Sequence, residues 1–237
     1  MPPKLALRRV LRATVAIPWR NRAAFVRVLA APVVALVVMD LVVEWAEHAL
    51  GGWRSVVLSV AWWALFVVIA VRTHRLVLAK DEEQMAKASL RWSWRETRFF
   101  GWLLVIYFQV ALLGLLLAML GLAIMWVVPS GPFQLMVVVA VLPAAYLLAR
   151  LSLIFPAVAL DRPVDFGWAW ARSAGNGWRL VLVVAVLPLA FSVVATAANS
   201  ALVAAVLAAP LVVLEVVALS AAYRALVVET APAGVGH

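Results

Sequence analysis

Six long apolar stretches divide the chain and leave few options for its fold. Each approaches or exceeds the roughly 20 apolar residues that a helix needs to cross about 30 Å of hydrocarbon. A soluble domain is about half apolar and a quarter charged, whereas 67% of these 237 residues are hydrophobic and 13% are charged. The sequence therefore predicts an all-α fold, a polytopic membrane helix bundle with six transmembrane helices at Ala23–Val43, Ser55–Val71, Phe99–Val128, Phe133–Leu153, Leu180–Ala198 and Ala201–Ala222.

Basic residues lie on one side of this predicted threading. If the N-terminus is cytoplasmic, every Lys and Arg except Arg54 falls in a cytoplasmic segment or at the cytoplasmic end of a helix. Cytoplasmic loops of membrane proteins carry an excess of Lys and Arg. We therefore expect a multi-pass protein of the inner (plasma) membrane with both termini in the cytoplasm. The net charge of +9 then lies on these cytoplasmic loops, where anionic lipids are the expected partner. Nucleic acid is not an expected partner.

The threading divides the chain into three parts. Residues 1–22 form a basic segment in which apolar residues recur at helical spacing among arginines. Such an amphipathic helix is typical of segments that lie on an anionic membrane surface. Residues 23–228 form the six-helix transmembrane domain, and residues 229–237 form a flexible tail.

Tryptophans and basic residues gather in the two cytoplasmic segments that precede the third and fifth helices. Indole rings prefer the headgroup boundary, and clustered Lys and Arg bind anionic headgroups. We therefore expect a cytoplasmic lipid interface, or a surface for a membrane protein partner, formed by Lys87, Arg91, Trp92, Trp94, Arg95, Arg98, Trp168, Trp170, Arg172, Trp178 and Arg179. For the stripe from Lys87 to Arg98, a solvated helix face is the alternative.

Two charges are deeply embedded in apolar sequence, Arg150 in the fourth helix and Glu215 in the sixth. Counting at 1.5 Å per residue, both fall at a similar depth. An unpaired charge in hydrocarbon is costly, so we expect a buried salt bridge that locks the two helices together. On this reasoning, removing both charges recovers part of the stability lost when Arg150 alone is removed. The alternatives are a pocket for a substrate or lipid headgroup, and an arginine that extends toward the interface.

A polar stripe occupies the outer end of the first helix. Asp40, Glu44, Glu47 and His48 recur at i, i+4, i+7 and i+8, which places them within about 100° of the helix circumference. Three acids and an imidazole on one face are able to bind a divalent cation or to pass protons. The alternative is that the helix simply ends there in water, with Arg54 as a nearby partner.

Catalytic signatures are missing from the chain. It has no cysteine, no phosphate-binding glycine loop, no HExxH and no GxSxG motif. We therefore expect a non-enzymatic protein without a cofactor. Two alternatives stay open: a small transporter or export component with a polar path through Arg150 and Glu215, and an intramembrane lipid-modifying enzyme that uses the polar stripe of the first helix.

Four short motifs lie in the second half of the chain: Arg150-Leu-Ser-Leu-Ile-Phe-Pro156-Ala, Trp170-Ala-Arg-Ser173, Gly175-Asn176-Gly177-Trp178-Arg179 and Ala221-Ala-Tyr223-Arg224-Ala-Leu226. With these motifs the chain resembles a widespread and mostly uncharacterised bacterial family of six-helix membrane proteins. That family is akin to the membrane domain attached to some glycerophosphoryl diester phosphodiesterases. The resemblance implies a six-helix bundle in a bacterial inner membrane and contact with lipids. It implies no phosphodiesterase activity, because the hydrolase barrel is a separate domain with no counterpart here.

Overall fold

The computed structural model describes residues 4–49, 53–79, 91–127, 133–197 and 200–229. Its elements are α1 (Leu7–Arg20), α2 (Arg22–Ala49), α3 (Trp53–Leu78), α5 (Trp94–Val127), α6 (Phe133–Leu151), α7 (Ile154–Ala159), α8 (Phe166–Arg172), α9 (Gly177–Val181), the π-helix η1 (Leu182–Val186), α10 (Leu187–Thr196), α11 (Ala201–Tyr223) and the π-helix η2 (Arg224–Val228).

Six helical stretches are long and apolar enough to cross a membrane, which confirms the predicted all-α bundle. Six of their twelve ends lie within three residues of the predicted ends, and the other six differ by four to seven residues. The spans are Arg22–Ala46, Val56–Leu78, Trp94–Ile124, Val138–Ala159, Gly177–Thr196 and Ala201–Val228.

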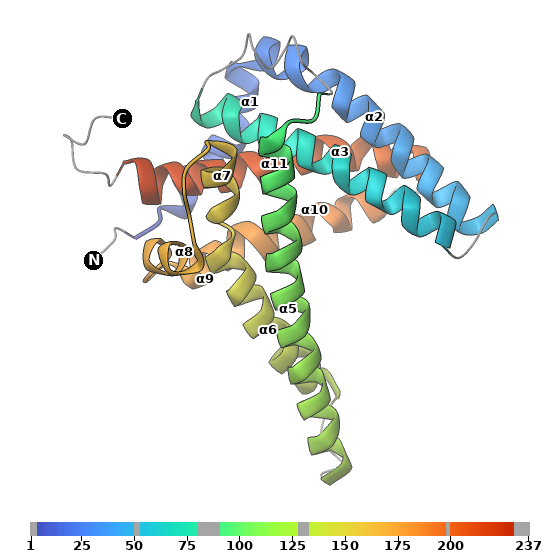
Figure 1. The fold of residues 1–237 in the computed structure, drawn as a ribbon, viewed down its shortest axis with the longest axis vertical. Coiled ribbons are helices and arrows are strands. Elements are labelled where there is room, and N and C mark those ends of the chain that lie inside the picture. Colours follow the sequence, from blue (N-terminus) through green and yellow to red (C-terminus); the bar gives the residue numbers. More distant parts are fainter. Residues whose placement is uncertain (1–3, 50–52, 80–90, 128–132, 198–199, 230–237) are drawn as a thin grey trace.

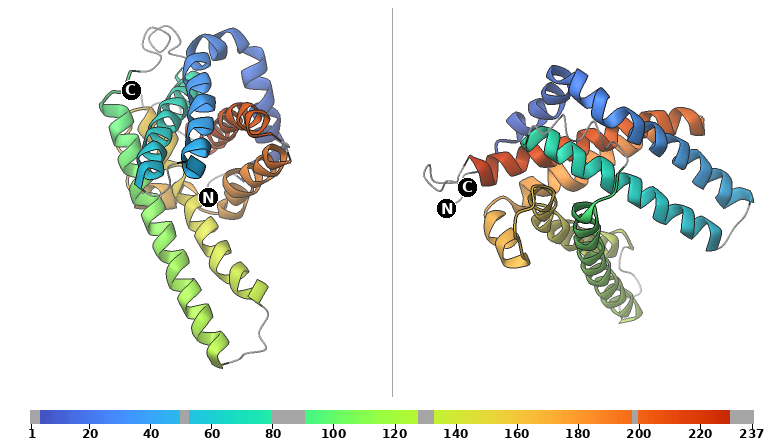
Figure 2. Two further views of the ribbon diagram at one scale, coloured as in Figure 1. Left: turned by 90° about the vertical axis from the view of Figure 1, so that its right-hand side faces the viewer. Right: turned by 45° about the horizontal axis from the view of Figure 1, so that its top comes forward.

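The spans form three hairpins that meet at one end of the molecule. α2 packs along α3, α5 along α6, and α10 along α11. α11 also packs against α2 and α3, so these helices and α10 form one arm. The α5–α6 hairpin leaves this arm at a steep angle and forms a second arm (Figure 1, Figure 2). We call the end where the two arms meet the convergent end.

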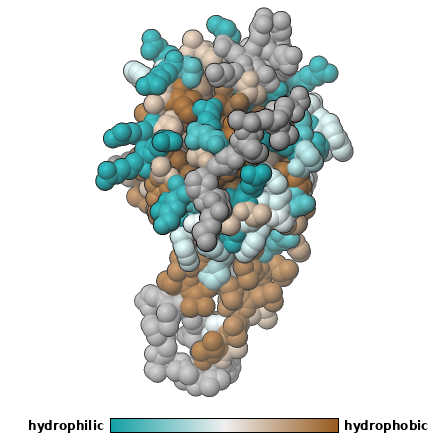
Figure 3. Space-filling model, turned by 90° about the vertical axis from the view of Figure 1, so that its left-hand side faces the viewer, coloured by the Kyte–Doolittle hydropathy of each residue, from teal (hydrophilic) through white to brown (hydrophobic). Residues whose placement is uncertain are grey.

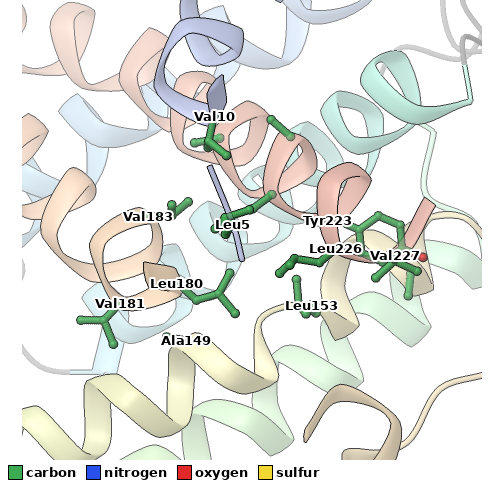
Figure 4. Close-up of a cluster of buried hydrophobic side chains, with 14 residues drawn as sticks. Leu5, Val10, Ala149, Leu153, Leu180, Val181, Val183, Tyr223, Leu226 and Val227 are labelled. Carbon is green, nitrogen blue, oxygen red and sulfur yellow. The ribbon is translucent and has the colours of Figure 1, made fainter. Parts of the chain in front are cut away.

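Much of the buried core lies at the convergent end. One cluster brings together Leu5 from the N-terminal segment, Leu153 from the link between α6 and α7, Leu180 from α9 and Tyr223 from α11, all at most 2% exposed (Figure 4). The far part of α5 is different, because large apolar residues such as Leu116 and several neighbours are exposed. Lipid tails are as apolar as leucine, so burial against protein is not required there.

Polarity follows the same division. Hydrophilic side chains cover much of the convergent end, whereas the projecting α5–α6 hairpin is hydrophobic (Figure 3). Such an arrangement suits an integral membrane protein whose arms lie in lipid and whose convergent end reaches the headgroups and water.

The chain between α6 and α9 leaves the apolar arm, crosses the convergent end and returns. Pro156 has no N–H, so the carbonyl of Ser152 accepts instead from the Phe155 N–H at 3.1 Å, where α6 gives way to α7. Asp165 caps the N-terminus of α8 by accepting a 2.7 Å hydrogen bond from the Trp168 N–H. Gly175, with a φ of 73°, then turns the chain toward α9.

α1 forms the predicted amphipathic helix, but it packs differently from the prediction. Val10 and Thr14 are buried, because this face of α1 packs on α11. Leu11, Val15 and Trp19 lie on another face and are exposed. The expected single apolar face is therefore divided: one part packs against protein and the other is available to lipid.

Candidate functional site

Arg150 ties the end of α6 to α8. The side chain is only 8% exposed, its Nε donates to the Ser173 Oγ at 2.9 Å, and its Nη2 donates to the Trp170 carbonyl. The guanidinium carbon also lies 3.5 Å from the centroid of the Trp170 ring. Hydrogen bonds from a charged donor and a cation–π contact are both stronger in a desolvated site. Arg150 therefore has a structural role, because it joins α6 to α8 at the convergent end.

The predicted salt bridge between Arg150 and Glu215 is not formed, as the described residues on both helices show. Glu215 lines a cavity with Tyr107 and Pro188 in the middle of the spans. The error has a physical reason: a long arginine side chain extends toward the polar end and finds partners there. The suggested polar path through both residues is also not seen, because Arg150 does not line the Glu215 cavity.

Asp161 binds two arginines, one from α5 and one from α3. Arg95, on the first turn of α5, donates from Nε to both carboxylate oxygens at 3.0 and 2.9 Å and from Nη2 at 2.5 Å. The Nη1 of Arg75, on α3, lies 3.5 Å from the same carboxylate. Asp161 follows α7 with a φ of 58°, a left-handed conformation that aspartate tolerates better than most residues. The cluster joins α3, α5 and the link after α7.

Three further arginines bind the protein's own chain at this end. Arg162 donates to the Tyr223 hydroxyl at 3.2 Å, Arg179 donates to the Leu5 carbonyl at 2.9 Å, and Arg224 donates to the Val77 carbonyl. Arg179 was expected in a lipid interface, as was Arg95. Part of the positive charge that the sequence assigns to lipid is therefore used for internal hydrogen bonds.

The basic stripe predicted from Lys87 to Arg98 is not one continuous helix face. Lys87 lies outside the described residues, and Arg91 is exposed in the non-helical segment before α5. Arg95 binds Asp161, and Arg98 is partly buried on α5. In the second segment, Arg172 ends α8 and is also partly buried.

A capping box explains why α5 begins where it does. The Glu96 Oε2 accepts hydrogen bonds from the Ser93 N–H at 2.8 Å and from the Ser93 hydroxyl, while the Ser93 Oγ accepts from the Arg95 N–H at 3.3 Å. Serine followed three residues later by glutamate before an apolar run is a recognisable helix start. This signal is present in the sequence and would have moved the predicted start from Phe99 to Trp94.

Four of the exposed tryptophans form two separate groups. Trp92 and Trp94 lie at the start of α5, whereas Trp170 and Trp178 both lie next to Tyr146, with ring centroids 6.5 and 5.0 Å from that of the tyrosine. Within the described part of the chain, no ring contact joins the two groups. All four are substantially exposed, as expected for rings at a headgroup boundary.

Trp168 departs from this pattern. Its ring is partly buried and lies 6.4 Å from that of Tyr223. Of the tryptophans predicted to face the lipid interface, it is the one that packs into the protein.

The N-terminal segment is bound to the second half of the chain. The Leu5 N–H donates to the Asn176 Oδ1 at 2.7 Å, and the Leu5 carbonyl accepts from Arg179. Both partners lie more than 170 positions away in the sequence. Asn176 lies in one of the four motifs but, like Asp161, is not among the predicted site residues. The Leu5 N–H and carbonyl are backbone groups that nearly every residue has, so the sequence does not indicate that they take part in these bonds.

A cavity of about 470 Å³ lies between α1 and the end of α11. We call it the α1 cavity. Its walls combine cationic groups with apolar side chains, and the Nη1 of Arg9 lies 3.6 Å from the Glu229 carboxylate at its rim. The lining residues are Lys4, Leu5, Ala6, Arg9, Val10, Ala13, Ile17, Ala221, Arg224, Ala225 and Glu229.

The outward side of α1 carries both charge and apolar surface. We define the α1 surface as the exposed residues Arg8, Leu11, Arg12, Val15 and Trp19. On a helical projection at 100° per residue, these five residues fall within about 100° of one another. α1 therefore has a cavity with cationic and apolar walls on its inner side and a mixed basic and apolar face on its outer side.

The polar stripe of α2 is only partly described. The Asp40 Oδ1 accepts a 2.5 Å hydrogen bond from the Trp62 Nε1 and so links α2 to α3. Asp40 and Glu44 line a cavity of about 280 Å³, whereas the side chains of Glu47 and His48 lie outside the described residues. Among the side chains that are described, no three His, Asp or Glu residues form a group suited to a metal ion. The metal site stays a prediction.

The convergent end thus holds a network of hydrogen-bonded arginines, two groups of exposed tryptophans, and the basic helix α1 with a cavity between it and α11. Comparisons of the chain with protein-family models, curated proteins and solved structures find no match. The resemblance to six-helix bacterial membrane proteins therefore remains an expectation from its motifs. What the fold establishes is an all-α integral membrane protein with six candidate spans.

Proposed function

We propose that this protein is a non-enzymatic inner-membrane protein that binds anionic phospholipid headgroups at its convergent end, which faces the cytoplasm. The observation that carries the proposal is α1, which has cations around the α1 cavity on one side and the α1 surface on the other.

The α1 cavity has the chemistry of a phospholipid headgroup site. Lys4, Arg9 and Arg224 provide positive charge, while Val10 and Ile17 provide an apolar wall for the start of an acyl chain. Basic pockets beside membrane helices on the cytoplasmic side bind anionic headgroups. The single carboxylate at the rim, Glu229, pairs with Arg9 and leaves the cavity with net positive charge.

The α1 surface supports the same reading. Leu11, Val15 and Trp19 are able to enter the boundary between headgroups and acyl chains, while Arg8 and Arg12 reach phosphates from the same face. The exposed tryptophans at the start of α5 and next to Tyr146 are suited to the same headgroup boundary.

Native mass spectrometry in a mild detergent tests this proposal. We expect the wild-type protein to retain added phosphatidylglycerol in preference to phosphatidylcholine, and we expect the double variant Lys4→Gln, Arg9→Gln to lose that preference. Each basic residue near an anionic surface contributes about 1 kcal/mol, so the loss corresponds to a roughly 30-fold weaker affinity.

The double variant Arg91→Gln, Arg98→Gln is the matched control, because it removes the same charge from the other predicted face. If that variant loses the preference and the α1 variant keeps it, the headgroup site lies near the start of α5 and α1 is the wrong element. Equal retention of the two lipids by the wild-type protein refutes anionic lipid binding altogether. A retained protein chain in place of lipid would favour the partner-binding alternative.

A further inference from the structure

Glu215 lies in a cavity at the centre of the bundle, which shares no lining residue with the α1 cavity. The cavity has a volume of about 110 Å³ and is lined by residues from five of the six spans. Phe66 comes from α3, Tyr107 from α5, Leu148 from α6, Pro188 from α10 and Glu215 from α11. At 1.5 Å per residue, Glu215 is about 20 Å from either end of its span.

The Glu215 carboxylate has no positive partner there. No Lys, Arg or His is among the described residues that line the cavity, and no described cation forms a salt bridge with Glu215. Arg150, the expected partner, is bound to Ser173 and Trp170. Tyr107 is the other titratable group that faces the cavity, from α5. An isolated ionised carboxylate in the middle of a bilayer is strongly disfavoured.

The backbone beside Glu215 is irregular. Pro188 has no N–H to donate to the preceding turn, and the π-helical turn η1, Leu182–Val186, ends two residues before it. Val183 and Val184 from that turn line the same cavity as Glu215. π-helical turns leave the regular hydrogen-bond ladder and are frequent at functional sites. A protonated carboxyl group donates a hydrogen bond as well as accepting one. It is therefore suited to a site where proline leaves a backbone carbonyl without its usual N–H donor.

We propose that Glu215 is an intramembrane proton-binding site, whose carboxyl group carries a proton in the folded protein and exchanges it as the pH rises. The ligand is the proton itself, held between the Tyr107 side and the η1–Pro188 side of the cavity. This activity is separate from headgroup binding at α1 and does not depend on it.

Labelling with dicyclohexylcarbodiimide, a lipid-soluble reagent for protonated carboxyl groups, tests the proposal. The carboxyl oxygen adds to the central carbon of the carbodiimide and its proton moves to a nitrogen, so nothing leaves. The adduct rearranges to a stable N-acylurea that adds the full mass of the reagent to the peptide. In the purified full-length protein, we expect the peptide that contains Glu215 to be modified at mildly acidic pH and several-fold less at alkaline pH.

Two variants serve as controls. Glu215→Gln, which resembles the protonated acid in shape and charge, is expected to keep the wild-type melting temperature in detergent and to lose the modification. Asp40→Asn removes another acid within a span, one that already accepts a hydrogen bond from Trp62, and is expected to leave the modification of Glu215 intact. Absence of modification at Glu215 in the wild type, modification that does not fall at alkaline pH, or a marked loss of melting temperature in Glu215→Gln overturns the proposal.

Discussion

Replacing Arg150 by alanine removes two hydrogen bonds and a close cation–π contact of one buried side chain. The substitution eliminates the 2.9 Å hydrogen bond to the Ser173 Oγ, the bond to the Trp170 carbonyl and the cation–π contact with the Trp170 ring. A hydrogen bond to a charged group contributes about 1.5–3 kcal/mol, and a desolvated cation–π contact contributes about 2 kcal/mol. Because removal of the guanidinium also removes its own desolvation cost, we expect a net loss of about 3 kcal/mol in the free energy of unfolding.

Double-mutant cycles separate the two candidate partners of Arg150. With Ser173→Ala, the cycle should give a coupling energy of about 1 kcal/mol, since the two side chains share a hydrogen bond. With Glu215→Gln, the effects of the two substitutions on the free energy of unfolding should add to within about 0.5 kcal/mol, as is usual for sites without shared partners.

Equilibrium unfolding in mixed micelles, followed by circular dichroism, measures all of these free energies on one scale. The reasoning fails if the Arg150–Glu215 coupling matches the Arg150–Ser173 coupling. It also fails if removal of Glu215 restores stability to the Arg150→Ala variant, because restoration is the expected sign of a broken ion pair.

Two other substitutions probe the convergent end. Gly177→Ala should lower the free energy of unfolding by about 1–3 kcal/mol, because the new Cβ would lie 2.6 Å from the Tyr146 Cζ. In a Tyr146→Ala background, the same substitution should change the free energy of unfolding little. An equal loss in both backgrounds would show that this clash is not the cause. Asn176→Ala should speed hydrogen exchange at the Leu5 amide about fivefold, as expected for the loss of one buried hydrogen bond worth about 1 kcal/mol. Unchanged exchange at Leu5, measured by mass spectrometry, would show that another group protects this amide.

The membrane spans were predictable because hydrocarbon thickness constrains both their length and their composition. The start of α5 at Trp94 was also predictable from the Ser93–Glu96 pair, although hydropathy alone places it later. The partners of Arg150 were not predictable in the same way. Depth along a helix follows from counting residues, but the side of the helix on which a charge lies depends on packing.

The contacts of the N-terminal segment show the same limit. Helical spacing in residues 5–15 predicts an amphipathic helix, and α1 is one. Spacing does not reveal that Val10 packs on α11 while Val15 stays exposed. The hydrogen bond between the Leu5 N–H and Asn176 crosses most of the chain, and its donor is a backbone group that every residue except proline has.

The divergence of the two arms gives the molecule the outline of a wedge. Within a bilayer, a wedge occupies a small cross-sectional area in one leaflet and a larger area in the other, with acyl chains between its two arms. We expect lateral pressure in the wider leaflet to act on the angle between the α5–α6 hairpin and the other spans. Bilayer thickness and curvature would then be coupled to the conformation of the protein.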